Sequence, residues 1–231
     1  MAGGQGIRLR PLTYVIPKPL LPLGDITILE YLVKNLSKNG FDDIFLICFY
    51  QHEKFRPCLS YAEKYHIKME MVVEEKGMGT AGGIFLIKKK LDNDFLVING
   101  DLLVDMDFKS MFDFHVTQKA DITIGATKYS FTVPHGVIEL TDNDHLKSIT
   151  EKPRYSHLIN SGIYVLNVSV LGSEENGNSS LDMPSLISVA KGKNKSVLVY
   201  DIGDHWLDTG ELDEYERAVG QIEEWSKDKL L

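Results

Sequence analysis

The chain has 231 residues, of which 43% are hydrophobic, so it is long and apolar enough to bury a substantial core. Its formal charge of −8 excludes a general binder of nucleic acids or membrane surfaces, because the overall field repels phosphate backbones and anionic lipids. Any site for an anionic ligand must therefore be locally basic. Length alone allows one large domain or two small ones, and we expect a single domain over residues 1–231.

The two cysteines, Cys48 in an apolar run and Cys58 in a predicted helix, are typical of buried side chains in a reducing compartment. No apolar stretch approaches the roughly 20 residues that a membrane-spanning helix needs. Met1 is not followed by a basic and then apolar leader. We therefore expect a cytoplasmic protein.

The N-terminal segment places three glycines beside two arginines and a lysine. Glycines let a backbone approach a phosphate closely, and the cations balance the charge of that phosphate. The segment predicts a nucleotide site that contains Gly3, Gly4, Gln5, Gly6, Arg8 and Lys18. A flexible tail is the alternative, and the leucines interleaved with the charges disfavour it. Only Met1 and Ala2 precede the first glycine, so we expect the first strand of the fold to be truncated.

Strand and helix patterns alternate through the first half, which is typical of βαβ units around a parallel sheet. Thr27 and Glu30 form a capping box that predicts a helix ending before Gly40. Apolar runs predict strands at 44–49, 67–73 and 95–98, with helices at 53–65 and from the 77–83 loop to about residue 91. Because ligands bind at the carboxyl ends of such strands, the loops that follow them should share one crevice.

The second half changes to short strands joined by turns, which favours an antiparallel or mixed layer on the same sheet. Strands are predicted at 122–124, 136–140, 146–149 and 162–166, and helices at 183–191 and 212–225. Residues 172–180 are rich in Gly, Ser, Asn and Glu and predict a surface loop.

Seven motifs together resemble the sugar-1-phosphate nucleotidyltransferase family. They are GGQGIRLRPLT at 3–13, PKPLLP at 17–22, GTAGG at 79–83, NGD at 99–101, EKP at 151–153, NSG at 160–162 and WLDTG at 206–210. The resemblance implies an α/β, Rossmann-like three-layer fold of glycosyltransferase-A type, with a mixed, mostly parallel central sheet. It also implies a nucleotide-binding half at 1–110 and a sugar-phosphate-binding half at 111–231.

The runs HGVIEL at 135–140, SGIYVL at 161–166 and LDMP at 181–184 look most like transferase domains that accompany CBS domains and make GDP-sugars. A CBS-type regulatory module upstream in the parent protein would follow from that resemblance. A homo-oligomer is left open.

The reaction that the resemblance implies is attack by a sugar-1-phosphate oxygen on the α-phosphorus of a nucleoside triphosphate, which releases pyrophosphate. No covalent enzyme intermediate is needed, so the protein must hold two anions in line and stabilise the charge that develops. Asp101 and Asp208 each follow a predicted strand, and carboxylates in one crevice are apt ligands for Mg²⁺. Either residue alone is more commonly a helix cap or a turn residue.

The family pattern assigns Arg8 to the β- and γ-phosphates and Lys18 to the α-phosphate, while Arg10 is left as a surface cation. The pattern assigns Glu151 to sugar hydroxyls and Lys152 to the sugar phosphate, with Gly136 and Asn160 completing the sugar pocket; a surface ion pair is the alternative for the Glu-Lys pair. The chain departs from the family at Ile7, where Thr or Ser is usual. A hydroxyl contact is lost there, and we expect weaker nucleotide binding.

The loop containing Gly79, Thr80 and Gly82, preceded by Glu74, looks more like guanylyltransferases than like the thymidylyl or uridylyl branches. Glu75 follows Glu74 in the same approach to the loop. A guanine offers N1–H and N2–H donors, from which a carboxylate or a backbone carbonyl can accept hydrogen bonds. GTP is therefore favoured, and dTTP, UTP and CTP stay as alternatives. Mannose, glucosamine or heptose phosphate would each fit the sugar residues.

Two other classes compete with this interpretation. A module that senses nucleotide without turnover is the main alternative, and the intact set of Arg8, Lys18, Asp101, Lys152 and Asp208 argues against it. A Rossmann-type oxidoreductase is disfavoured because no GxGxxG opens a helix with a ribose-binding acid at the proper distance.

Overall fold

The computed structural model describes residues 1–91, 93–172 and 180–228. In that part of the chain no helix is both long and apolar enough to cross a membrane. The loop predicted at 172–180 falls almost entirely outside the described residues. The helices of the first half are η1 (Ile7–Leu9), α1 (Leu12–Val15), η2 (Lys18–Leu20), α2 (Ile28–Lys38), η3 (His52–Ser60), α3 (Tyr61–Tyr65), α4 (Gly79–Gly82), η4 (Gly83–Lys90) and α5 (Phe108–Thr117).

The strands of the first half are β1 (Pro22–Leu23), β2 (Ile26–Thr27), β3 (Asp43–Cys48), β4 (Lys68–Val73), β5 (Asp94–Ile98) and β6 (Leu102–Val104). The second half contains β7 (Ile122–Thr132), β8 (Val137–Leu140), β9 (Leu146–Thr150), β10 (Arg154–Asn167), η5 (Val168–Leu171), α6 (Met183–Gly192), β11 (Val197–Asp201), β12 (Trp206–Asp208) and α7 (Leu212–Asp228).

The described sheets are mixed. A four-stranded sheet has the order β11-β7-β10-β5, in which β11 is parallel to β7 and the other two pairings are antiparallel. β3 and β4 form a separate parallel pair, and β6 pairs with β12 in antiparallel orientation. The expectation of an α/β fold with a mixed sheet is confirmed. Among the described strand pairs, however, antiparallel pairs outnumber parallel ones, so the sheets are less parallel than the sequence suggested. Apart from the short β1–β2 pair, each antiparallel pair includes a strand from the second half of the chain.

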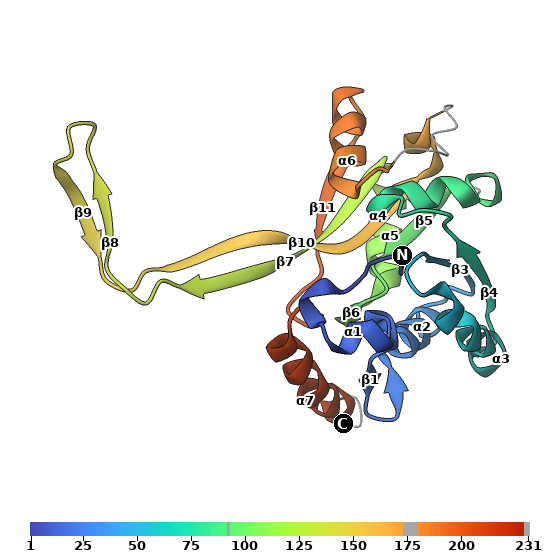
Figure 1. The fold of residues 1–231 in the computed structure, drawn as a ribbon. Coiled ribbons are helices and arrows are strands. Elements are labelled where there is room, and N and C mark those ends of the chain that lie inside the picture. Colours follow the sequence, from blue (N-terminus) through green and yellow to red (C-terminus); the bar gives the residue numbers. More distant parts are fainter. Residues whose placement is uncertain (92, 173–179, 229–231) are drawn as a thin grey trace.

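Helices cover both faces of this sheet, and β10 shows how (Figure 1). Ile163 and Val165 pack with residues of α2 and α5, whereas Tyr164 and Leu166 pack with residues of η4 and α6. Successive strand residues point to opposite faces, so an uninterrupted apolar run is what a strand buried on both sides requires. The result is three layers, with helices on either side of the sheet.

The capping-box prediction is confirmed, because the Thr27 hydroxyl accepts a hydrogen bond from the Glu30 amide at 3.1 Å at the start of α2. The helix predicted at 53–65 differs in detail. Residues 52–60 form a 3₁₀ helix that contains Pro57, and the α-helix begins only at Tyr61. Proline cannot donate the backbone hydrogen bond that a regular α-helix needs in its interior, which explains the tighter first part.

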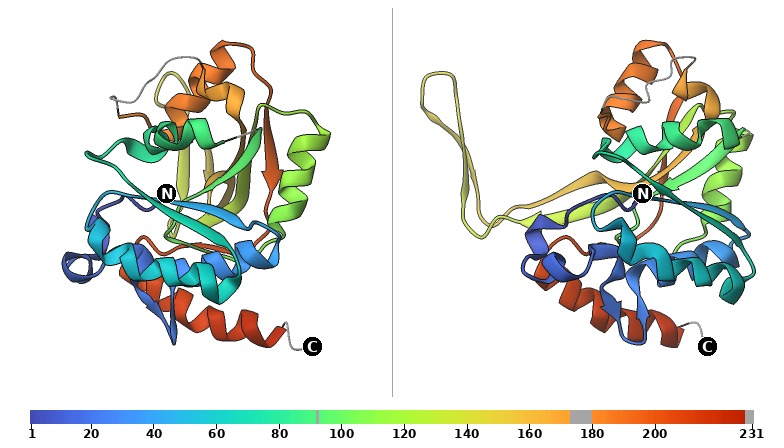
Figure 2. Two further views of the ribbon diagram at one scale, coloured as in Figure 1. Left: turned by 90° about the vertical axis from the view of Figure 1, so that its right-hand side faces the viewer. Right: turned by 45° about the vertical axis from the view of Figure 1, so that its right-hand side comes forward.

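β7 and β10 are longer than the sequence pattern predicted, at 11 and 14 residues. Their outer parts leave the sheet together and lead to the β8–β9 hairpin, which stands clear of the body in Figure 1 and in the right-hand view of Figure 2. We call residues 128–158 the arm. Within the described residues, β8 and β9 pair only with each other.

The N-terminus lies between β3 and β5, with the hydrogen-bond pattern of a parallel strand. The Met1 amine donates to the Ile98 carbonyl at 2.8 Å, and the Gly100 amide donates to the Met1 carbonyl at 2.7 Å. Ala2 forms a parallel bridge with Cys48 on the other side. Beyond these two residues the two strands are not paired with each other, and a cavity of about 380 Å³ lies between them. Its lining is mostly apolar and comes from β3, β5, α2 and η4.

An engineered extension of five apolar residues before Met1 should enter this cavity as a strand between β3 and β5. Each fully buried Val or Ile contributes about 1.5–3 kcal/mol, against about 1–2 kcal/mol for fixing its backbone. The expected result is a rise in Tm of at least ~2 °C, since ~1 kcal/mol shifts Tm by that order in a domain of this size. Thermal unfolding followed by circular dichroism measures it. An extension of five serines is the control, and an equal Tm for both extended chains would contradict the prediction.

Candidate active site

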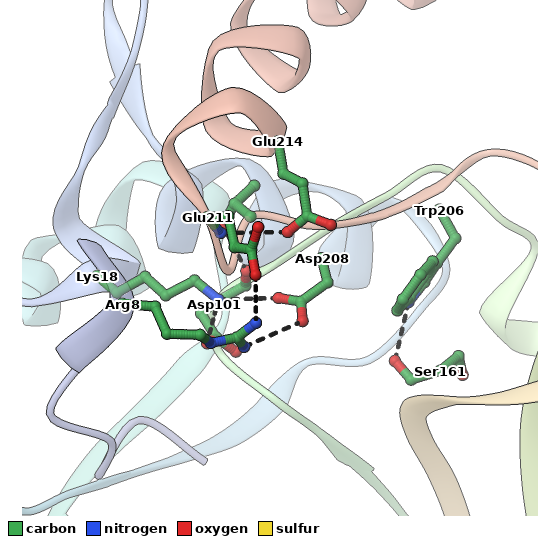
Figure 3. Close-up of polar contacts among 9 residues, drawn as sticks. Arg8, Lys18, Asp101, Ser161, Trp206, Asp208, Glu211 and Glu214 are labelled. Atoms are coloured by element: carbon green, nitrogen blue, oxygen red, sulfur yellow. Dashed lines mark hydrogen bonds and ion pairs between the residues drawn. The ribbon is translucent and has the colours of Figure 1, made fainter. Parts of the chain in front are cut away.

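Lys18 lies between two carboxylates that come from distant parts of the chain. Its ammonium Nζ is 2.7 Å from Asp101 Oδ2 and 2.9 Å from Asp208 Oδ1 (Figure 3). Lys18 belongs to η2, Asp101 follows β5, and Asp208 ends β12. The prolines on both sides of Lys18 restrict its backbone, and only 6% of the residue is exposed. The three residues that the sequence assigned to the α-phosphate and the metal are therefore in direct contact.

The local fold holds these carboxylates in place. The Thr209 hydroxyl donates to the Asp101 carbonyl at 2.9 Å, which ties the end of β12 to the loop after β5. Two carboxylates held this close repel each other, and the buried ammonium between them compensates that electrostatic repulsion. Thr209 is fully buried and was not among the predicted site residues, although it lies inside the WLDTG motif.

Arg8 extends over the same cluster from the glycine loop. Its guanidinium is 3.7 Å from Asp208 Oδ2 and 3.6 Å from Glu211 Oε1, and its side chain is largely exposed (Figure 3). A Cβ at Gly210 would lie 2.6 Å from Nη2 of Arg8, so the guanidinium could keep this position only beside a glycine and would otherwise have to shift. Gly210 and Glu211 were also missed as site residues. The glycine that ends WLDTG was the signal for the first, and Glu211 has no comparable signal.

The glycine loop adopts a fixed conformation beside Lys18. Gly6 has a φ of +59°, and a Cβ there would lie 2.8 Å from Cγ2 of Thr13. The Thr13 hydroxyl donates to the Gly6 carbonyl at 2.7 Å, which closes the loop. A pocket of about 510 Å³ is lined by Gly3, Gly4, Gln5, Gly6, Ile7, Arg8, Lys18, Phe49, Gly77, Asp101 and Gly210. The structure thus brings the predicted phosphate loop, both cations and one predicted metal ligand to one pocket.

Glu74 lies next to this loop and is only 4% exposed. Its Oε2 accepts a hydrogen bond from the Met78 amide at 3.1 Å and lies 3.5 Å from where a Cβ on Gly3 would be. Burial raises the pKa of the Glu74 carboxyl, while the Met78 amide and the terminal amine act in the opposite direction. A Cβ at Gly83 would lie 2.3 Å from its Oε1, so the carboxyl group also requires glycine at that position.

The other residues predicted to contact the base support α6. The Thr80 hydroxyl accepts a hydrogen bond from the Met183 amide at 2.8 Å, at the start of that helix. Gly79 has a φ of +77° and lies against the Leu181 carbonyl, which also accepts from the Gly82 amide at 3.1 Å. Gly79, Thr80 and Gly82 do not line the pocket of the glycine loop, to which Gly77 contributes instead. Of the residues predicted to contact the base, Glu74 is the one that lies next to Gly3.

The predicted sugar residues separate into two groups. Asn160 lies at the base of the arm, where its amide donates to the Tyr164 hydroxyl at 2.6 Å and its side-chain oxygen accepts from the Gly162 amide at 3.1 Å. Gly136, Glu151 and Lys152 lie on the arm, and a Cβ at Gly136 would be 3.0 Å from Oε2 of Glu151. Because the arm projects from the body (Figure 1), these three residues are not brought together with Lys18 and Asp101 in one chain.

A divalent metal would have Asp101 and Asp208 as its protein ligands. Their oxygens already share one cation, and Mg²⁺ typically uses one or two carboxylates with water and substrate phosphate as the remaining ligands. The donor set fits such an ion. Within the described residues, no group of three or more His, Cys, Asp or Glu side chains is placed to hold a metal without substrate.

Comparison with known proteins identifies the family of this chain. It belongs to the nucleotidyl transferase family, whose model matches residues 1–224. It is 33% identical over 219 residues to the mannose-1-phosphate guanyltransferase of Aspergillus oryzae, and 34% identical over 220 residues to that of Candida albicans. Each match covers 91% of this chain and 60% of the relative, so the chain spans about three fifths of the length of these relatives.

Solved structures share the fold at lower sequence identity. HddC from Yersinia pseudotuberculosis superposes with a TM-score of 0.74 at 24% identity, over 96% of both chains. The same protein in complex with GMP-PN gives a TM-score of 0.74 at 22% identity. The three-layer nucleotidyltransferase fold expected from the sequence is confirmed by this similarity.

Glu74→Gln should leave the protein at least as stable as the parent at pH 7. The raised pKa of Glu74 means that the folded state favours its neutral carboxyl. The parent protein therefore loses stability as the pH rises from the pKa of this carboxyl in the unfolded state through its higher pKa in the folded state. Glutamine keeps an acceptor for the Met78 amide and carries no charge to bury. Urea unfolding at pH 4.5 and pH 7 measures the difference, which should favour the variant more at pH 7. The control is Glu75→Gln, which changes an exposed neighbouring carboxylate. A Glu74→Gln protein that is less stable to urea than the parent at pH 7 would contradict the prediction.

Proposed function

We propose that this chain transfers a guanylyl group from GTP to a sugar-1-phosphate, giving a GDP-sugar and pyrophosphate. The observation that carries the proposal is the contact of Lys18 with both Asp101 and Asp208 beside the glycine loop. Family membership supports the reaction class, and similarity to mannose-1-phosphate guanyltransferases supports guanine as the base. Mannose-1-phosphate is accordingly the first acceptor to test, followed by glucosamine and heptose phosphates.

The chemistry follows from the charges in the pocket. An oxygen of the sugar phosphate attacks the α-phosphorus, and the bond from that phosphorus to the bridging oxygen of pyrophosphate breaks. Arg8, whose planar guanidinium suits phosphate oxygens, would stabilise the departing pyrophosphate. Lys18 would lie near the α-phosphate and would stabilise the negative charge that develops there. Mg²⁺ held by Asp101 and Asp208 would supply further charge neutralisation when bound.

The division into halves is part of the same proposal. Residues 1–110 contribute the glycine loop, Lys18, Glu74 and Asp101, which would hold the triphosphate and read the base. Residues 111–231 contribute Asp208, Asn160 and the arm with Glu151 and Lys152, which would hold the sugar phosphate. A cytoplasmic location would give such an enzyme access to the free nucleotides that it uses.

Pyrophosphate release tests the reaction directly. The protein is incubated with Mg²⁺ and each combination of GTP, ATP, CTP, UTP or dTTP with mannose, glucosamine, heptose or glucose 1-phosphate. Release should be fastest with GTP and one of the first three sugars. No release with any pair, while GTP still binds by calorimetry, would favour the nucleotide-sensing alternative over the enzyme.

Asp101→Asn and Asp208→Asn should each reduce turnover by about 100-fold, because each removes negative charge that a metal needs next to the transferring phosphorus. The folds should persist, since Lys18 keeps the second carboxylate as a partner in each variant. Turnover is measured across a range of Mg²⁺ concentrations, and Tm is measured in parallel. The control is Asp113→Asn, which removes an exposed carboxylate paired with Lys109 on α5. Full activity in both site variants would refute the metal assignment.

A further inference from the structure

The base of the arm is fixed to the body from both of its strands. The Ser161 hydroxyl of β10 donates to the Gly125 carbonyl of β7 at 2.8 Å, and the Trp206 indole donates to the Ser161 carbonyl at 2.8 Å (Figure 3). The Thr127 hydroxyl donates to the Gly203 carbonyl at 2.7 Å. Ser161 and Thr127 are almost completely buried. Buried hydrogen bonds of this kind are costly to break, so the direction in which the arm leaves the body is set by the fold.

The arm exposes apolar side chains along one face of its long strands. Phe131 is opposite Tyr155, and Tyr129 is opposite His157, so four rings lie on the same side of the ribbon. The ring centroids of Tyr129 and Phe131 are 6.1 Å apart, and those of Phe131 and Tyr155 are 5.7 Å apart. The three aromatic residues other than His157 are among the exposed large hydrophobic residues of the chain.

The β8–β9 hairpin at the end of the arm has an apolar face of its own. Ile138 is opposite Ile149 and Leu140 is opposite Leu146, and all four side chains are more than half exposed. A two-stranded hairpin is only marginally stable alone in water, and contiguous exposed apolar surface marks an interaction site. The arm therefore requires a covering surface.

A matching surface lies on the body, in the segment from Ile7 to Lys18. It consists of the exposed apolar residues Ile7, Leu12, Tyr14, Val15 and Ile16, on and around α1. The segment is held rigidly, because the Tyr50 hydroxyl donates to the Thr13 carbonyl at 3.2 Å and the Gln51 amide donates to the Tyr14 carbonyl at 2.9 Å. A surface that covers this patch would lie directly beside the two phosphate-binding cations.

We propose that two copies of this chain exchange arms, so that each arm covers the α1 patch of the other copy and presents Glu151 and Lys152 to the other copy's Lys18, Asp101 and Asp208. The inference rests on the proposed function. A single chain exposes both the apolar arm and the apolar patch that would receive it. It also separates the residues expected in one site, because the predicted sugar-phosphate residues lie on the arm and the predicted nucleotide residues lie on the body. A closed two-fold dimer covers both surfaces and completes both sites at once.

Charge is compatible with this exchange. Lysines and arginines balance the acidic residues along the arm, whereas the whole chain has a formal charge of −8. The body is therefore the acidic part, and a neutral arm meets no net repulsion from the body of the second copy.

Oligomeric state gives the first test, which is independent of activity. Light scattering after size exclusion should give twice the 26.1 kDa mass of the chain. Ile149→Glu on the arm and Val15→Glu on the patch should each give monomers that still bind GTP, since neither residue lines the nucleotide pocket. The control is Val189→Glu, an exposed apolar residue on α6 that should leave the dimer intact. A parent protein that is monomeric at 100 times the assay concentration, or dimers that survive both variants, would overturn the proposal.

Complementation between two inactive variants gives the second test. Lys152→Ala damages the arm, and Asp208→Asn damages the body. When the two variants are mixed and allowed to exchange subunits, about half of the dimers contain one chain of each kind. In such a dimer the intact arm of one chain meets the intact body of the other, so one of its two sites is intact. Activity should therefore return to about a quarter of the parent level. If the arm serves its own body, each chain keeps its defect and the mixture stays as inactive as the separate variants, which would overturn the exchange. Absence of pyrophosphate release from the parent would refute the proposed function alone, because the dimer measurement does not depend on it.

Discussion

The ion pair of Lys18 with Asp101 and Asp208 is the interaction on which the arrangement of the body depends. It joins η2, the loop after β5 and the end of β12, and Lys18 and Asp208 are 190 residues apart in the sequence. A buried lysine without a partner, or two carboxylates without a cation, would each be strongly unfavourable. The three segments are therefore held together by the same charges that the proposed reaction uses, and stability and phosphate chemistry share one set of contacts.

β10 connects this body to the arm, and the burial of its residues changes along its length. From Ile163 onward it is buried on both faces, whereas its outer part is exposed. The change occurs at residues 160–162, where the register with β7 shifts and Gly162 adopts a φ of +77° against the Asn99 side chain. Asn160, which the sequence assigned to the sugar pocket, lies at this transition. Its position is thus defined by the body, while Glu151 and Lys152 are positioned by the arm.

The parts that the sequence predicted well depend on local patterns. The cap at Thr27 and the strand that became β3 follow from spacing and apolar runs. The ends of two predicted strands also indicated that Asp101 and Asp208 lie close together, and both contact Lys18. The extent of β7 and β10 was missed, although Tyr129, Phe131 and Tyr155 alternate with polar residues as a half-buried strand would. That signal is weak because these three aromatic residues remain exposed, with no described part of the chain covering them. The role of Thr80 was not predictable, since its partner Met183 is 103 residues away.

The charges around Lys18 also explain why nucleotide and metal should bind together. Arg8 and Lys18 face Asp101, Asp208 and Glu211, so the cluster has no cationic excess to offer an incoming triphosphate. Phosphate oxygens can engage the two cations only if these give up carboxylate partners, and the released carboxylates then carry uncompensated charge. In the proposed reaction, a divalent cation would offset that charge and that of the triphosphate at once. Binding of each ligand would therefore lower the cost of binding the other, and linkage requires such a coupling to be equal in both directions.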